Sequence, residues 1–158
     1  QTTDNEYYLD HNLNQEYDKN GSIFMDKDCD VLKPSTNFIL YGHHMEKGKM
    51  FGQLDLFENK KYFKNHKTGK LFFNDQWHKV DFFAFLYTDA YDDMIYDTLL
   101  RWETDGQRYL EYIQEKLINY REISSGKKTF LTLFTCNSNS TNGRYILIGY
   151  IKNSSDDS

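Results

Sequence analysis

Short apolar blocks separated by turn-forming residues dominate the chain and predict a structure built mainly from β-strands. Blocks of this length, rich in aromatic and β-branched residues and bounded by Asn, Asp or Gly, are typical of strands. The turn signal Asn20-Gly21 precedes the first block, and Asn74-Asp75 separates the third block from the fourth. The expected strands are residues 22–25, 37–41, 71–73, 79–87, 129–136 and 145–151.

Apolar residues at helical spacing interrupt this pattern, first in the stretch 49–65, which predicts one or two short helices. Farther along the chain, one stripe comprises Met94, Ile95, Leu99 and Trp102, and another comprises Leu110, Ile113, Leu117 and Tyr120. Thr104 with Gln107 fits a capping box at the start of the second helix, and Gly126 lies where that helix would end. The pattern is mainly β with helical insertions, and it predicts a closed or nearly closed β-barrel with helical additions.

Composition indicates one folded domain that does not bind nucleic acid. The 158 residues suffice for one core, and no repeat or linker divides them, so we expect a single domain over residues 1–158 with frayed tails at 1–4 and 153–158. An aromatic content of 17% with a single Pro excludes a largely disordered chain. The net charge is −5 and no stripe of Lys and Arg is present, which excludes a nucleic-acid partner.

The sequence contains no targeting or membrane-spanning segment. The apolar run 82–87 is far shorter than the ~20 residues of a membrane span, and no signal peptide precedes the first strand. Because the sequence begins abruptly at Gln1, we expect it to be a trimmed chain whose native N-terminal segment is missing.

The last predicted hairpin carries the strongest candidate for chemistry. Cys136 ends an apolar strand and is followed by a polar loop, and Arg144 opens the next strand. If the two strands pair antiparallel, the thiol and the guanidinium lie at the same end of neighbouring strands. A cation in that position lowers the pKa of a thiol and can stabilise an oxyanion. An inert cysteine at a strand end is the alternative interpretation.

A thiol nucleophile needs a base, and His43 is the candidate because it follows a predicted strand and Gly42. The alternative is that His43 and His44 are simply exposed in a loop. A metal site using both is disfavoured, since adjacent side chains of an extended segment point apart. The remaining histidines lie in polar surroundings without evident partners and are interpreted as surface residues: His11, His66 and His78.

The other cysteine, Cys29, lies in a polar run and has no assigned role. A disulfide between Cys29 and Cys136 is neither required nor excluded by the sequence. Cys and His residues at zinc-like spacing are absent, so no structural metal and no cofactor are expected.

Taken together, these residues resemble the sortase family. The sequence Thr-Leu-Phe-Thr-Cys at 132–136 resembles the sortase signature Thr-Leu-x-Thr-Cys. Arg144 stands where sortases keep their arginine, and Tyr-Gly-His at 41–43 resembles the Gly-His that supplies their imidazole. The resemblance to class B rests on residues 20–26, on 41–45 with 49–54, and on a long helical insertion at 92–121 before the cysteine strand. It covers about residues 7–152.

The resemblance implies an eight-stranded closed barrel with an N-terminal helix, on the outer face of a Gram-positive cell and held there by an N-terminal membrane anchor. It implies Cys136 as nucleophile, His43 as acid and base, and Arg144 as oxyanion ligand. The substrate would be a surface protein with a C-terminal sorting signal, and the acceptor an amine of peptidoglycan. One departure is Asn137, where several class B members have an acidic residue.

Two rival functions use the same residues differently. A cysteine peptidase would employ Cys136 and His43 but pass the acyl group to water, usually with Asn or Asp orienting the imidazole. A non-catalytic binding module would leave Cys136 as a buried, slowly reacting thiol. The sequence does not identify the sorting signal, the anchored proteins, the acceptor amine or the oligomeric state.

Overall fold

The computed structural model describes residues 1–30, 32, 36–98, 102–124, 126, 128–136 and 142–152. Its elements, with η for a 3-10 helix, are η1 (Tyr7–Leu9), β1 (Phe24–Met25), β2 (Asn37–Tyr41), η2 (Glu46–Gly48), η3 (Leu54–Glu58), α1 (Lys60–Asn65), β3 (Thr68–Phe73), β4 (Gln76–Asp89), α2 (Trp102–Gln114), β5 (Leu117–Tyr120), β6 (Thr129–Cys136) and β7 (Gly143–Ile151). The mainly β prediction is confirmed, and strands β2 and β6 have the predicted bounds. The expected tail at 153–158 lies outside the described residues.

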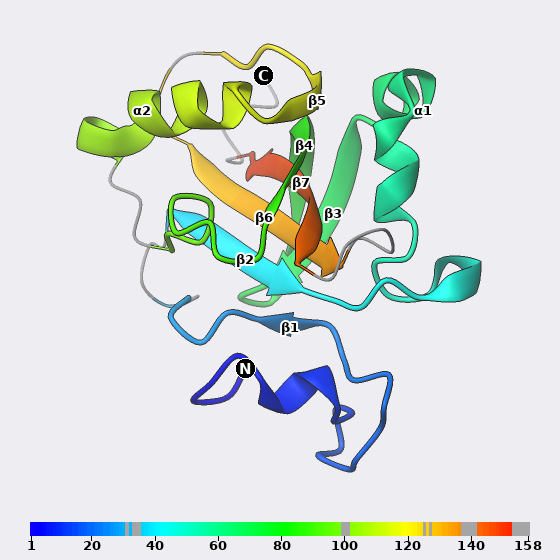
Figure 1. The fold of residues 1–158 in the computed structure, drawn as a ribbon. Coiled ribbons are helices and arrows are strands. Elements are labelled where there is room, and N and C mark those ends of the chain that lie inside the picture. The colour runs from blue at the N-terminus through cyan, green and yellow to red at the C-terminus, as the bar shows by residue number, and fades with distance from the viewer. Residues whose placement is uncertain are drawn as a thin grey trace.

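One sheet organises these strands in the order β1-β2-β6-β7-β4-β3, with β5 paired to β4 (Figure 1). Strands β2 and β6 run parallel, and the other pairs are antiparallel. Within the described part of the chain the sheet has seven strands and is not closed by hydrogen bonds, so the expected closed eight-stranded barrel is not found. Strand β1 lies at one edge of the sheet and is only two residues long. The residues before and after it form other hydrogen bonds: the Ser22 amide donates to the Tyr8 carbonyl, and the Cys29 amide donates to the Asp26 carbonyl.

Both faces of the sheet are covered, because successive side chains of a strand point to opposite sides. In β7, Ile146 and Ile148 lie in one core, and Tyr145 and Leu147 lie in a second. Helix α2 packs on the first core, whereas η3 and α1 pack on the second, so these helices lie on different sides of the sheet (Figure 1). The catalytic candidates are therefore carried by strands that are fixed from both faces.

Four helical predictions need correction. The first stripe is not helical at Met94 and Ile95, because residues 93–96 form turns. Helix α2 spans Trp102–Gln114, so Thr104 lies inside it and does not start it. The second stripe was expected to remain helical to Tyr120, but Leu117–Tyr120 forms strand β5. The expected N-terminal helix is a single 3-10 turn, η1, which buries none of its side chains and so lacks the packing that sustains longer helices. Leu99 of the first stripe lies outside the described residues.

A buried hydrogen bond fixes the cysteine strand against β2. The Thr132 hydroxyl donates to Asn37 Oδ1 at 2.7 Å, and both residues are fully buried. We expect Thr132→Val to lower the free energy of unfolding by about 1–3 kcal/mol, since it leaves a buried amide oxygen without its donor. Urea unfolding measures this.

The matched control is Thr135→Val on the same strand. The Thr135 hydroxyl is buried and has no partner among the described residues, so its removal should cost little or nothing. Equal losses of stability in the two variants would contradict this account.

Candidate active site

Three adjacent strands bring the candidate residues to one edge of the sheet. Tyr41 of β2 is paired with Phe134 of β6, and the Gly42 amide donates to the Phe134 carbonyl at 3.1 Å. Because these strands run parallel, His43 and Cys136 both lie two residues beyond this pair. The expected antiparallel pairing of the last two strands is confirmed, with Cys136 directly opposite Arg144.

The thiol of Cys136 and the loop that begins with Asn137 lie outside what the structure describes. Arg144 is half-buried, and its Nη1 donates to the Gly143 carbonyl at 2.9 Å. The backbone therefore brings a cysteine, a histidine and an arginine together; the strand pattern predicted this for Cys136 and Arg144, and the resemblance to sortases implied it for His43.

The imidazole of His43 is held by the N-terminal part of the chain. Its Nε2 donates a hydrogen bond to the Leu9 carbonyl at 2.7 Å. A carbonyl only accepts, so this contact fixes a proton on Nε2, and in the neutral imidazole Nδ1 is then the nitrogen without a proton. The adjacent His44 points elsewhere, with its Nε2 3.0 Å from Asp55 Oδ2.

The two histidines thus have separate partners. Among the described residues no group of three or more His, Cys, Asp or Glu side chains is arranged to hold a metal ion.

The loop after His43 folds back tightly on the strand end. The Phe51 amide donates to the His43 carbonyl at 3.2 Å, and the Phe51 ring covers Gly42. A Cβ at Gly42 would lie 2.7 Å from that ring, which explains why glycine precedes the histidine. The chain can therefore turn at Gly42 and present His43 at the sheet edge.

A cleft of about 390 Å³ lies at this edge, lined by His43 and Arg144. Residues of the N-terminal segment, including Leu9, form part of its lining, and Tyr91 and Tyr96 from the loop after β4 form another part. The Tyr96 ring stacks on Phe134 with centroids 4.4 Å apart. The cleft therefore offers an aromatic surface beside the polar candidates, as expected for a peptide-binding site.

A buried carboxylate holds the loop that carries Tyr96. Asp92 accepts hydrogen bonds from the Thr88 hydroxyl and from the Tyr112 hydroxyl, the latter at 2.8 Å, and Lys116 Nζ lies 3.1 Å from Asp92 Oδ2. Burial alone would raise the pKa of Asp92, but these hydrogen bonds lower it below its ordinary value. The carboxylate stays ionised at neutral pH and ties the loop to α2.

Cys29 is a free, buried thiol, so no disulfide joins it to Cys136. Its Sγ accepts from the Ile39 amide at 3.4 Å. Burial raises the pKa of this thiol to about 11. At neutral pH Cys29 is therefore protonated and belongs to the core.

The predicted surface position is confirmed for His66, which is exposed, whereas His11 and His78 are half-buried, and the expectation that these histidines lack partners is wrong for all three. His11 stacks on Tyr7, and His66 stacks on Tyr62. The third, His78, is half-buried and stacks on Phe73. Polar neighbours in the sequence do not reveal aromatic partners one turn away or across a hairpin.

Sequence reasoning missed the contribution of the N-terminal segment and of the loop after β4 to the cleft. These side chains reach the cleft only through contacts with distant parts of the chain.

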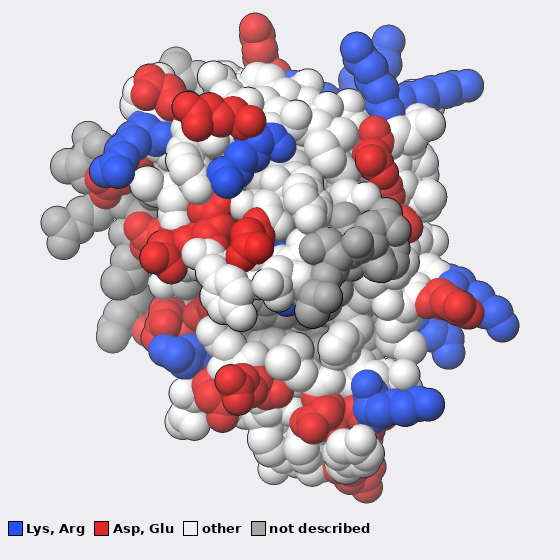
Figure 2. Space-filling model, in the orientation of Figure 1, with Lys and Arg blue, Asp and Glu red and all other residues white. Residues whose placement is uncertain are grey.

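Exposed acidic and basic residues are interspersed over the face in Figure 2, with no continuous basic stripe there. No helix within the described ranges is long and apolar enough to cross a membrane.

Comparison with known proteins identifies the family to which the chain is similar. The family model described as the Sortase domain matches residues 2–152. Sortase B of Listeria monocytogenes is 31% identical over 152 residues, which cover 94% of this chain and 61% of that protein. The chain thus spans less than two thirds of this curated relative.

Solved structures show the same fold. A class B sortase of Streptococcus pyogenes involved in pilus biogenesis superposes with a TM-score of 0.86 and 31% identity, covering 96% of this chain and 83% of that one. A substrate complex of Staphylococcus aureus sortase B superposes with a TM-score of 0.85 and 26% identity, covering 97% and 72%.

Proposed function

Since the chain belongs to the sortase family, we propose that it is the catalytic part of a class B cysteine transpeptidase. The observation that carries the proposal is the meeting of three strand ends, which places His43, Cys136 and Arg144 at one edge of the sheet beside the cleft. A nucleophile, a proton-transfer group and a cation at one cleft are the parts that acyl transfer needs.

The reaction begins when the Cys136 thiolate attacks the carbonyl carbon of the threonine in a sorting signal. Arg144 and a backbone N–H stabilise the tetrahedral oxyanion. As the peptide bond breaks, His43 in its imidazolium form protonates the departing amine, which leaves a thioester on Cys136. His43, now neutral, deprotonates the incoming amine, whose attack forms the new amide and releases the Cys136 thiolate, which restores the thiolate and imidazolium of the starting enzyme.

The donor is a surface protein bearing a C-terminal sorting signal, and the acceptor is a peptidoglycan amine. The solved substrate complex of the Staphylococcus aureus relative supports a sorting-signal donor, and the aromatic lining of the cleft suits a peptide. We place the enzyme on the outer face of a Gram-positive cell membrane, held by an N-terminal anchor. Transfer to water is the slow side reaction.

The test is cleavage of quenched fluorescent peptides carrying a panel of sorting signals, with and without an added amine. Cleavage of one signal after threonine, with an amide product when amine is present, supports the proposal. Cleavage that yields only acid at saturating amine would contradict transpeptidation and favour the peptidase.

Arg144 separates these two functions, because a plain cysteine peptidase does not depend on an arginine for its oxyanion. We expect Arg144→Ala to lower kcat/KM by about 10²–10³-fold, the usual effect of losing an oxyanion donor. Arg144→Lys should recover only part of this, since an ammonium lacks the planar fork of the guanidinium. The control is Arg108→Ala, which removes an exposed arginine of α2; equal rates in the Arg144 and Arg108 variants would remove Arg144 from the mechanism.

A further inference from the structure

The N-terminal segment (residues 1–9) contacts the catalytic candidate His43, yet little apolar burial holds it in place. Its Leu9 carbonyl accepts the hydrogen bond from His43 Nε2, and Asn5 lines the same cleft. The 3-10 turn η1 buries no side chain, and Leu9 is 42% exposed. The position of the Leu9 carbonyl therefore depends on polar and backbone contacts.

One of these anchors is the turn before β1. The Ser22 amide donates to the Tyr8 carbonyl at 2.9 Å. Gly21 has a φ of +59°, and a Cβ there would lie 2.5 Å from the Leu9 carbonyl oxygen. Glycine at this position thus leaves room for the carbonyl that His43 uses.

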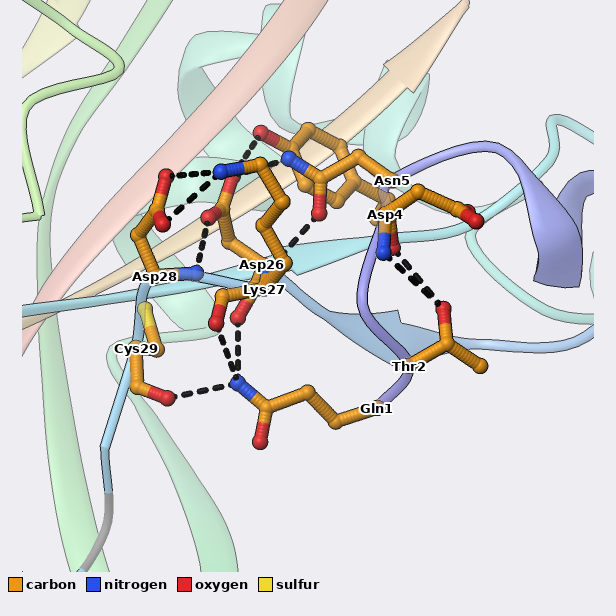
Figure 3. Close-up of polar contacts among 9 residues, drawn as sticks. Gln1, Thr2, Asp4, Asn5, Asp26, Lys27, Asp28 and Cys29 are labelled. Carbon is orange, nitrogen blue, oxygen red and sulfur yellow. Dashed lines mark hydrogen bonds and ion pairs between the residues drawn. The ribbon is translucent and has the colours of Figure 1, made fainter.

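The other anchor is Asp26, whose side chain is the centre of a hydrogen-bonded cluster (Figure 3). Asp26 is 5% exposed. Its Oδ2 accepts from Asn5 Nδ2 at 2.8 Å, and its Oδ1 accepts from the Asp28 amide at 2.9 Å. In return, Asn5 Oδ1 accepts from the Lys27 amide at 2.7 Å, so Asn5 is held on both of its polar atoms.

The same carboxylate reaches the strand that carries His43. The Tyr41 hydroxyl donates to Asp26 Oδ2 at 2.7 Å, and Tyr41 ends β2, two residues before His43. Asp26 therefore joins the N-terminal segment, through Asn5, to the end of β2, through Tyr41. The N-terminal segment contains Leu9, whose carbonyl accepts a hydrogen bond, and the end of β2 leads to His43, which donates that hydrogen bond.

The chemistry of Asp26 fits this joining role. Both oxygens of a carboxylate accept hydrogen bonds, and each can accept two at once. A neutral amide side chain has one accepting oxygen and one donating nitrogen, so it cannot accept hydrogen bonds at both positions. Burying a carboxylate is unfavourable unless its oxygens are hydrogen-bonded. Here the donors are an amide side chain, a phenol and a backbone amide. The Asp26 carboxylate therefore accepts from the N-terminal segment, from β2 and from its own turn.

We propose that Asp26 is a positioning residue that clamps the N-terminal segment to β2 and thereby keeps His43 as the Nε2–H tautomer, with Nδ1 left for catalysis. The expected fall in kcat rests on the proposed transpeptidase function, whereas the expected tautomer of His43 does not. Measuring kcat and the tautomer separately therefore distinguishes failure of this proposal from failure of the proposed function.

The test compares Asp26→Asn with the control Asp28→Asn, which removes an exposed carboxylate two residues away that pairs with Lys27. Imidazole nitrogen shifts from ¹⁵N-labelled protein report the tautomer, with the His43 signals assigned by their loss in His43→Gln. At a pH high enough for the imidazole to be neutral, we expect the wild type and Asp28→Asn to show Nε2–H, and Asp26→Asn to show a mixture. We also expect kcat to fall about 10- to 100-fold in Asp26→Asn alone, because small displacements of a catalytic group have effects of this size.

Asn5→Ala and Tyr41→Phe keep the proposal testable if Asp26→Asn does not fold. Asn5→Ala removes the hydrogen bond between Asp26 and the N-terminal segment and should still give a mixture of His43 tautomers. Tyr41→Phe removes the hydrogen bond between Asp26 and β2 and should do the same. An unchanged His43 tautomer in folded Asp26→Asn or Asn5→Ala overturns the proposal whether or not the enzyme is active, and an unchanged kcat in an active Asp26→Asn enzyme also overturns it.

Discussion

Cys136→Ala is expected to lose all measurable cleavage and transfer, a fall in kcat of about 10⁵-fold or more, as when other enzymes lose a nucleophile. The physical reason is that the acyl-enzyme no longer forms, and water or amine must attack the peptide bond directly. The measurement is peptide turnover together with iodoacetamide labelling followed by intact mass. Wild type should take up one label rapidly at neutral pH, and Cys136→Ala should take up none.

The chain supplies a matched control in Cys29→Ala. Burial raises the Cys29 pKa to about 11, so below that pH the thiol is protonated and unreactive, and its labelling should increase only as the pH approaches 11. Cys29→Ala should therefore keep the rapid label and the activity, although it loses some stability by leaving a small cavity. Rapid labelling of Cys136→Ala at neutral pH would show that the reactive thiol had been assigned to the wrong cysteine.

The strands around the site could be predicted because their signals are local. The apolar runs of β2 and β6 give the correct bounds, and the turn residues near Asn20 and Asn74 mark real turns. The pairing of Cys136 with Arg144 followed from a single loop between adjacent strands. Local patterns of this kind place Cys136 opposite Arg144 without knowledge of the rest of the fold.

Strand β5 could not be predicted, because distant contacts override its helical spacing. Leu117 continues the apolar stripe of α2, yet the segment pairs with β4. There Asn119 Nδ2 donates to the Phe57 and Glu58 carbonyls at 2.8 Å each, about 60 residues away in sequence. Tertiary hydrogen bonds of this kind decide between helix and strand when the apolar pattern fits both.

The wall of the cleft was unpredictable for the same reason. The bond from His43 to Leu9 spans 34 residues, and that from Asn5 to Asp26 spans 21. The polar run around Asp26 reads as an exposed loop, whereas in the fold Asp26 is buried at the centre of a cluster. A buried carboxylate in a polar sequence shows itself only when its partners are known.

His43→Gln is expected to lower kcat/KM by about 10³-fold or more, since general acid–base catalysis contributes about 10²–10⁴-fold and here serves both half-reactions. Glutamine keeps a donor for the Leu9 carbonyl but transfers no proton at neutral pH. Peptide turnover with and without amine measures both steps. The loss should exceed any effect of Asp26→Asn, which displaces the imidazole without removing it.

The neighbouring His44→Gln is the control for damage to the loop. His44 bonds Asp55, away from the cleft lining, and glutamine keeps a side-chain donor for that carboxylate, so its replacement should change kcat/KM by less than about 3-fold if loop structure is kept. Comparable losses at both positions would mean that the loop, and not the imidazole of His43, limits activity. A selective loss at His43 would instead show that the imidazole beyond the end of β2 transfers the proton, as expected from the pairing of β2 with the strand that carries Cys136.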